Sequence, residues 1–269
     1  MKKLLGLVIA LTLGLGLFPA MRGAELRGTL SIVGSTSVQL LAEELARAYM
    51  AINPKVTITV AGGGSGAGIR AARAGTADIG ASSRELKPEE KAGLVAAVIA
   101  RDGIAVVVNK ANGVSALTVE QVAKIYSGQI ANWKELGGPD ARIVLISRES
   151  GSGTRGAFEE LVLGKLAVAS SMMQQGSTGA VRQTVAVTES AIGYISLGQI
   201  DGSVKALRID GVAPSEANVL NKTYRISRPF LFVTKGAPKD LAKSFIDFVL
   251  GPAGQSIVAK EFVPVGRMK

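Results

Sequence analysis

The chain has 269 residues, 47% of them hydrophobic and 19% charged, so it can bury one large core or two medium-sized ones. It contains neither histidine nor cysteine, which excludes Ser-His-Asp and Cys-His catalysis, disulfide bonds and the usual zinc sites. The net charge of +10 would suit anions, anionic lipid or nucleic acid, but the 4% aromatic content and scattered basic residues disfavour nucleic acid and indicate mostly a soluble basic surface.

Residues 1–24 have the pattern of a secretory signal peptide. Lys2 and Lys3 form a basic start, and the apolar run at residues 4–18 is followed by small residues. The possible cleavage sites are poor, because a large residue lies where a small one is needed, so an uncleaved membrane anchor is the alternative. Export without cysteine is typical of a bacterial cell envelope. We therefore expect the protein in the periplasm or at the outer face of the cytoplasmic membrane.

The first part of the chain alternates strands and helices. "LRGTLSIVGS" predicts a strand, and the apolar spacing of Val38, Leu41, Leu45 and Tyr49 predicts a helix that ends at Asn53-Pro54. "KVTITV" predicts a second strand that breaks into glycines, and "GIRAARAGTADIGASSR" predicts a short helix followed by a strand. This order indicates an α/β fold with a parallel sheet.

The second part continues the pattern. We expect a buried strand at Ile104–Val108, a helix from Val119 that Thr118 caps, and Trp133 as a packing anchor. "RIVLI" predicts a strand, and the helix that follows should begin near Thr154. The remaining expectations are these: Phe158, Leu161 and Val162 facing inward, strands in "AIGYISLGQI", "VKALRIDG" and "YRISRPFLFVTKG", and a C-terminal helical region broken at Gly251-Pro252.

Three loops share one design, in which a strand ends in Gly, Ser or Thr residues and a helix begins. They lie at residues 34–37, 62–66 and 151–154, and the third carries Arg148 and Arg155 at its two ends. The first amides of a helix have no partner within the helix and carry partial positive charge, so they can bind an anion. Hydroxyls add donors, and an arginine can bind two oxygens at once. Each loop alone is typical of an ordinary cap or turn, but together they could surround a tetrahedral oxyanion.

Seven motifs occur in the order found in the phosphate-binding proteins of bacterial phosphate ABC importers. They are "GSTSV", "AGGGSGAGI", "ADIGASSRE", "LTVEQVAKIYSGQIANWKELGG", "RESGSGTR", "AIGYISLG" and "RPFLFVTKG". The chain resembles this family over nearly its whole length after residue 24. The resemblance implies a type II periplasmic-binding-protein fold, in which two crossover segments join two α/β lobes around a ligand cleft. Lobe one would comprise residues 25–107 and 230–269, and lobe two residues 108–229.

The resemblance also implies the ligand site and the partners. We expect inorganic phosphate as the ligand, permease subunits of an ABC transporter as partners, no cofactor, no metal, no nucleic acid and no enzymatic activity. We expect a monomer. The implied ligand-binding residues are Thr36, Ser37, Ser65, Ser83, Arg148, Ser152, Gly153 and Thr154.

Ser83 departs from the best-known members of the family, which have an aspartate there. That aspartate accepts the proton of hydrogen phosphate and repels sulfate, whereas a serine hydroxyl can either donate or accept. The alternative is therefore the same fold with another oxyanion, such as sulfate, molybdate or tungstate. Glu149 is expected to hold Arg148 or Arg155 and not the ligand, since a carboxylate repels an anion. Arg84 and Arg155 could each face the cleft or serve elsewhere.

Overall fold

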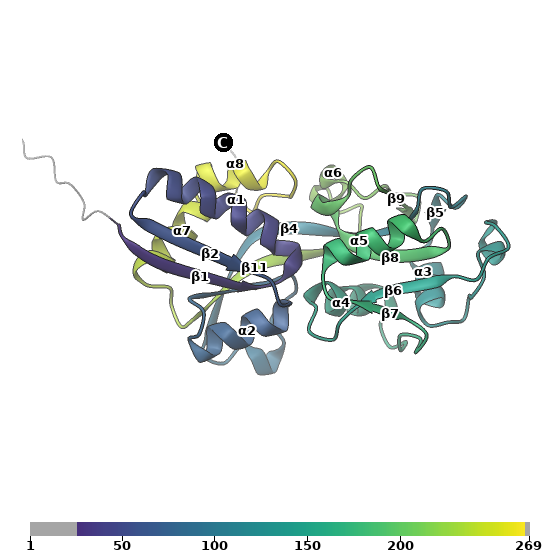
Figure 1. Ribbon diagram of the computed structural model, residues 1–269, viewed down its shortest axis with the longest axis horizontal. Coiled ribbons are helices and arrows are strands. Elements are labelled where there is room, and N and C mark those ends of the chain that lie inside the picture. The colour runs from purple at the N-terminus through teal and green to yellow at the C-terminus, as the bar shows by residue number, and fades with distance from the viewer. Residues whose placement is uncertain (1–25, 267–269) are drawn as a thin grey trace, which may run out of the picture.

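A computed structural model describes residues 26–266, so the predicted signal peptide at residues 1–24 lies outside the described residues. The described chain forms two α/β lobes that lie side by side, with helices on both faces of the sheet (Figure 1). The strand order is β2-β1-β3-β11-β4-β8-β6-β7, and β9 also pairs with β4. The prediction of two α/β lobes is confirmed.

The first lobe is built on parallel strands flanked by helices on both faces. β1 (Gly28–Gly34) pairs in parallel with β2 (Val56–Ala61) and with β3 (Ile79–Ser82). The four apolar residues predicted to face inward from the first helix are all buried. A core cluster joins this helix to the last two helices of the chain, and a second cluster on the opposite sheet face involves α2. The helices of this lobe are α1 (Thr36–Ile52), α2 (Ser65–Ala74), α7 (Asp240–Leu250) and α8 (Pro252–Val258).

The second lobe repeats this arrangement around β8 (Ala191–Ser196), which pairs with both β4 and β6. The larger core cluster packs α3 and α4 on one face of the sheet, and a smaller cluster packs α5 on the other. The other elements of this lobe are β5 (Ala116–Leu117), α3 (Val119–Tyr126), β6 (Val144–Arg148), α4 (Gly153–Phe158), β7 (Met173–Gln175), α5 (Thr178–Val187), β9 (Val204–Ala206), β10 (Arg208–Ile209) and α6 (Glu216–Leu220).

A helix cap, a break between two helices and a buried tryptophan lie where the sequence predicts them. Thr118 caps α3 by accepting from the Gln121 amide, and the break at Gly251-Pro252 separates α7 from α8, as predicted. Trp133 is fully buried and donates to the Ser190 carbonyl oxygen.

The expectation that Leu161 faces inward is wrong, because this side chain is 41% exposed. Helix α4 continues into a π-helical turn over Glu159–Leu163. A π turn has more residues than an α turn, which rotates the following side chains away from their α-helical positions. Phe158, which precedes that turn, is buried as predicted, and so is Val162.

The two lobes are joined by β4 (Leu94–Asn109) and β11 (Ser227–Lys235). The first part of β4 pairs antiparallel with β11, and its last part pairs with β8 and β9 of the other lobe. Along β4, Ile99 and Ala100 belong to the first lobe's core, whereas Ile104 belongs to the second lobe's core. The family resemblance predicts the lobe boundary near residue 107, and this boundary remains a proposal. The assignment of Ala100 to one core and Ile104 to the other supports a boundary between these two residues.

A buried ion pair lies at this crossing. The Arg228 side chain donates from Nε and Nη2 to Oδ2 of Asp102, over 3.1 and 2.9 Å. The other carboxylate oxygen of Asp102 accepts from the Ser196 hydroxyl and the Leu197 amide of the second lobe. Burial raises the pKa of Asp102 and lowers that of Arg228, because both charges have left water. The pair thus ties the two crossing strands to β8.

Candidate functional site

Four helices begin at the junction of the two lobes. They are α1 and α2 of the first lobe and α4 and α5 of the second (Figure 1), and a short loop rich in Gly and Ser joins each of them to the strand before it. The sequence predicts this outcome for the first three, since a Gly/Ser/Thr loop precedes each of them. Because the carboxyl ends of parallel strands share one edge of a sheet, the starts of the helices gather there.

Hydroxyl groups from the two lobes meet in one buried cluster. The Ser37 hydroxyl lies 2.8 Å from Oγ1 of Thr154 and 3.0 Å from Oγ1 of Thr178. Thr178 also lies 3.5 Å from the hydroxyl of Thr36, and its amide donates to that hydroxyl. Ser37, Thr154 and Thr178 are each at most 1% exposed. These contacts bring the first turns of α1, α4 and α5 within hydrogen-bond distance of one another.

The first lobe supplies three more hydroxyls beside these. Ser35 caps α1 and donates to the Ser83 hydroxyl over 2.8 Å. Ser65 accepts from the Ser83 amide, and its oxygen lies 3.4 Å from the Ser83 hydroxyl. We call the seven side chains of this site the hydroxyl cluster: Ser35, Thr36, Ser37, Ser65, Ser83, Thr154 and Thr178.

Glycine at position 153 permits the close approach of α4 to the first lobe. A Cβ atom there would lie 2.1 Å from Oγ of Ser65 and 2.7 Å from Oγ of Ser83. The neighbouring loops touch through their backbones as well, since the Gly66 amide donates to the Gly151 carbonyl oxygen over 3.1 Å. Only a residue without a side chain fits at position 153 in this arrangement.

Arg148 is the cation of the site and is 1% exposed. Its Nε and Nη2 atoms donate to the two carboxylate oxygens of Glu149, over 2.9 and 2.8 Å. Its Nη1 atom donates to the Thr178 hydroxyl over 3.0 Å. The interpretation that Glu149 holds Arg148 agrees with these contacts. One edge of the guanidinium is therefore fixed by the carboxylate, and the remaining nitrogen faces the hydroxyl cluster.

The structure brings the predicted site residues to one place, although not all of them in the same role. Thr36, Ser37, Ser65, Ser83, Arg148, Gly153 and Thr154 lie in or against the hydroxyl cluster. Ser152 instead uses its hydroxyl as the N-cap of α4, where it accepts from the Arg155 amide.

Ser35 and Thr178 also belong to the hydroxyl cluster, although neither was among the predicted ligand-binding residues. Thr178 has the most contacts with the predicted residues, and the signal for it was present in "QGSTGAVRQTVAV". This segment has the same design as the other three loops: a short strand, then Gly, Ser and Thr, then a helix.

The two arginines whose role was open have acidic partners. Arg84 forms a two-point ion pair with Glu90, over 2.7 and 2.8 Å, and that carboxylate has a lowered pKa because Arg84 donates to it. Arg155 donates to Glu159 and to the Arg148 carbonyl oxygen. Both arginines therefore support loops beside the cluster.

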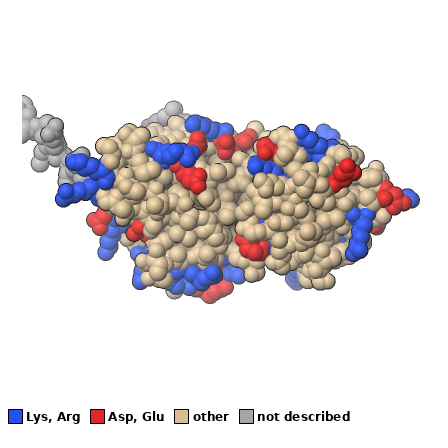
Figure 2. Space-filling model, in the orientation of Figure 1, with Lys and Arg blue, Asp and Glu red and all other residues tan. Residues whose placement is uncertain are grey.

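Three properties of the described chain concern metal binding, membrane crossing and surface charge. Within residues 26–266 no group of acidic side chains is placed to hold a metal ion. In the same range no helix is long and apolar enough to cross a membrane. On the face shown in Figure 2 basic and acidic side chains are interspersed, with no continuous stripe of one sign.

The arrangement can replace the hydration shell of a small anion with fixed dipoles. Hydroxyls and first-turn amides can donate from several directions, and their partial positive charge is spread around the ligand. Arg148 adds a charge-assisted donor, whereas Glu149 already neutralises part of its charge. Such a site favours a compact oxyanion.

Comparison with known proteins gives a consistent result. The sequence profile of the PBP superfamily domain matches residues 20–253. The phosphate-binding protein PstS of Bacillus subtilis is 37% identical over 250 residues, which covers 90% of this chain and 82% of the relative. The chain belongs to the PBP superfamily, in the family of the phosphate-binding proteins PstS.

Solved structures of the family have the same fold. A phosphate ABC transporter substrate-binding protein from Clostridium perfringens, solved with bound phosphate, is 46% identical with a TM-score of 0.86, covering 89% of this chain and 100% of that one. An ABC-type phosphate transport receptor from Vibrio cholerae is 37% identical with a TM-score of 0.73, covering 87% and 99%. The predicted periplasmic-binding-protein fold is thus confirmed.

Proposed function

We propose that the protein binds inorganic phosphate in the hydroxyl cluster and delivers it to the permease of an ABC importer. The observation that carries this proposal is the meeting of four helix starts, two from each lobe, at the hydroxyl cluster, to which Nη1 of Arg148 donates through Thr178. A tetrahedral anion has four oxygens to satisfy, and the cluster offers hydroxyl and amide donors from both sides.

The charge balance of the site supports a ligand that is held mainly by neutral groups. Arg148 is paired with Glu149, so the net charge next to the hydroxyl cluster is small. Binding of a dianion then depends on many oriented donors more than on one strong countercharge. Because donors from both lobes contribute, the ligand stabilises the closed arrangement of the lobes over an open one.

The transport role is inferred from the family. The relatives include proteins named as phosphate-binding components of ABC transport, and a closed, ligand-bound form would be the form that docks on the permease. We propose that the protein acts as a monomer outside the cytoplasmic membrane and that it is a binding protein without enzymatic activity.

Calorimetric titration of the purified protein with phosphate tests the proposal. Arg148→Ala should weaken phosphate binding by about 1.5–3 kcal/mol, or roughly 10-fold to 150-fold, because it removes a charge-assisted donor and leaves Glu149 without its partner beside the anion. Arg208→Ala is the matched control, since Arg208 is exposed on β10. The phosphate affinity of this variant should equal that of the natural protein. Equal affinities of all three proteins would exclude the hydroxyl cluster as the site.

Competition between phosphate and sulfate tests the identity of the anion. Sulfate keeps its charge between pH 5 and 8, whereas phosphate loses its second proton in this range, so phosphate binding should vary with pH. With Ser83 in place of a carboxylate, the hydroxyl can accept the ligand's remaining proton but does not repel sulfate. We expect a preference for phosphate. A preference for sulfate that stays constant across this range would contradict the proposal.

A further inference from the structure

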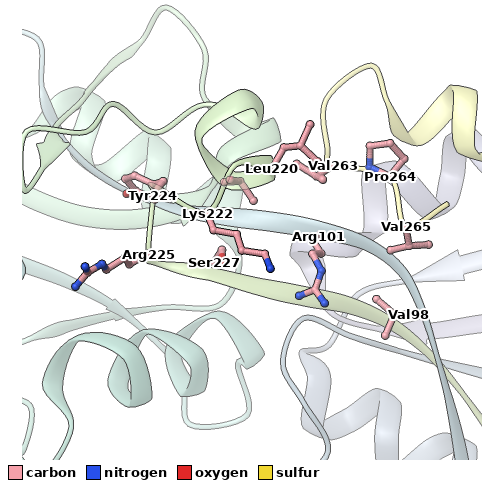
Figure 3. A pocket seen from close by; sticks show the side chains of 11 residues that line it. Val98, Arg101, Leu220, Lys222, Tyr224, Arg225, Ser227, Val263, Pro264 and Val265 are labelled. Carbon is pink, nitrogen blue, oxygen red and sulfur yellow. The ribbon is translucent and has the colours of Figure 1, made fainter. Parts of the chain in front are cut away.

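A cavity lies at the crossing between the lobes, apart from the hydroxyl cluster. Its volume is about 800 Å³, within the range of small-molecule sites. The first lobe contributes Val98 and Arg101 of β4 and the residues that follow α8, and the second contributes the end of α6 and the segment that leads into β11 (Figure 3). Because both lobes line it, its shape depends on the angle between them.

The cavity and the hydroxyl cluster lie on opposite faces of the crossing strands. Arg101 and Ser227 line the cavity, whereas their neighbours Asp102 and Arg228 are buried against the other side. Successive side chains of a strand point to opposite faces, which explains this division. Asp102 accepts from Ser196, and Arg228 donates to Asp102. The pleat of the two strands thus separates a front site from a rear cavity.

The charge of the rear cavity is positive. Arg101, Lys222 and Arg225 line it, and no acidic residue does. Figure 3 shows Lys222 and Arg101 extending toward the same space from the two lobes, while Arg225 extends away from it. All three residues are exposed, so the cavity opens to solvent at its charged end. An anionic group between Lys222 and Arg101 would meet a cation from each lobe.

The rest of the wall is aliphatic. Tyr224, the one aromatic residue of the lining, is 1% exposed and directs its hydroxyl to the Ile104 carbonyl oxygen, so it offers no ring face for stacking. Leu220, in contrast, is 65% exposed. An aliphatic chain matches this wall better than a planar ring. The apolar lining consists of Val98, Val219, Leu220, Val263, Pro264 and Val265.

From this combination we propose that the rear cavity binds a soluble organic anion with an aliphatic chain and a carboxylate head, and that this ligand strengthens phosphate binding. The chain would cover the aliphatic wall, and the head would lie between Arg101 and Lys222. Inorganic phosphate is a poor ligand for this site, because it cannot use the apolar wall.

The effect on phosphate binding follows from the geometry and rests on the proposed function. In the structure the front loops touch, as the hydrogen bond from Gly66 to Gly151 shows, and the rear cavity is open. Rotation about the crossing strands that separates the front loops brings the rear walls together. A ligand that holds the rear walls apart therefore favours front closure, and the two affinities must rise together.

Titration with octanoate tests the site, with octanol as the uncharged comparison. The variant is the doubly substituted Arg101→Glu/Lys222→Glu. The matched control is Lys110→Glu/Lys165→Glu, which makes the same charge change at two exposed residues outside the cavity lining. We expect octanoate to bind the natural and control proteins more tightly than octanol does. In the doubly substituted variant, the affinity for octanoate should fall at least tenfold. This variant should still bind phosphate without octanoate, which would show that the variant is folded.

The outcomes separate this proposal from the proposed function. Absence of octanoate binding to the natural protein, or equal octanoate affinity in the doubly substituted variant, would overturn the rear site whatever phosphate does. Absence of phosphate binding without octanoate would instead overturn the proposed function. Octanoate at a concentration that saturates the natural protein but not the doubly substituted variant should increase the phosphate affinity of the natural protein and leave that of the variant nearly unchanged. Identical phosphate affinities with and without octanoate would refute the coupling.

Discussion

Gly153→Ala should weaken phosphate binding by holding the two lobes apart. The added Cβ would lie 2.1 Å from Oγ of Ser65 and 2.9 Å from its Cβ. Rotation of the Ser65 hydroxyl removes only the first of these contacts, because the Cβ is fixed to the backbone. Ser65 begins α2 and Gly153 begins α4, so the overlap can be relieved only by moving one lobe relative to the other.

The size of the effect follows from this overlap. Non-bonded atoms prefer a separation of about 3.5 Å, so the contact with the Ser65 Cβ at 2.9 Å, which rotation cannot remove, requires a displacement of roughly 0.6 Å. Overpacking of this kind typically costs about 1–3 kcal/mol, and here it affects only the closed arrangement. We therefore expect phosphate affinity to fall by roughly 5-fold to 150-fold. The free energy of unfolding should change little, because each lobe has its own core.

Calorimetry on Gly153→Ala and on a control variant measures this effect. Gly151→Ala is the matched control, because a Cβ at position 151 has nothing within 4 Å. Its phosphate affinity should equal that of the natural protein. Small-angle scattering at saturating phosphate should show a larger radius of gyration for Gly153→Ala than for the control. If Gly153→Ala binds phosphate as tightly as Gly151→Ala, the lobes do not close on the ligand as inferred.

Three further predictions concern the site and the crossing. Thr178→Val should weaken phosphate binding by about 0.5–1.5 kcal/mol, because it removes the hydroxyl that accepts from Nη1 of Arg148 and keeps the shape of the side chain. Calorimetry measures this loss, and an unchanged affinity would exclude Thr178 from the site. Asp102→Asn should lower the free energy of urea unfolding by about 3–5 kcal/mol, since it leaves the buried Arg228 without its charge partner. Adding Arg228→Met should restore part of this loss, and equal stability of the single and double variants would contradict the reasoning. The ion pair with Arg84 lowers the pKa of Glu90 from its ordinary value, so the stabilisation by this pair is complete above the ordinary carboxyl pKa and is lost as the pH falls through the lowered pKa. Glu90→Gln should flatten the dependence of the unfolding free energy on pH in this acidic range, and a profile as steep as that of the natural protein would refute the assignment.

Much of the fold could be predicted because its elements depend on local patterns. The apolar spacing of α1, the Thr118 cap and the break at Gly251-Pro252 each involve residues close together in the chain. Leu161 was mispredicted because the π-helical turn that exposes it has no signature in the spacing of apolar residues.

The candidate site was only partly predictable, because local sequence patterns do not show which side chains face the junction of the lobes. A loop of Gly, Ser and Thr before a helix is visible in the sequence, but every such loop has the composition of an ordinary cap. Ser152 shows the difficulty, since its hydroxyl caps α4, whereas Thr154, two residues later, contacts Ser37 of the other lobe. Which hydroxyl serves the helix and which faces the junction depends on backbone direction, and composition does not encode this.

The sequence by itself limited the class of chemistry, because the absence of histidine and cysteine excludes the commonest catalytic sites and the repeated helix-start loops favour an anion-binding site. Only the tertiary structure decided that Thr178 joins this site, that Glu149 occupies one edge of Arg148, and that a positively charged cavity lies behind the crossing strands. Local patterns depend on neighbours in the chain, whereas these contacts join residues from both lobes, and their distances are set only when the sheet and the crossing strands are complete.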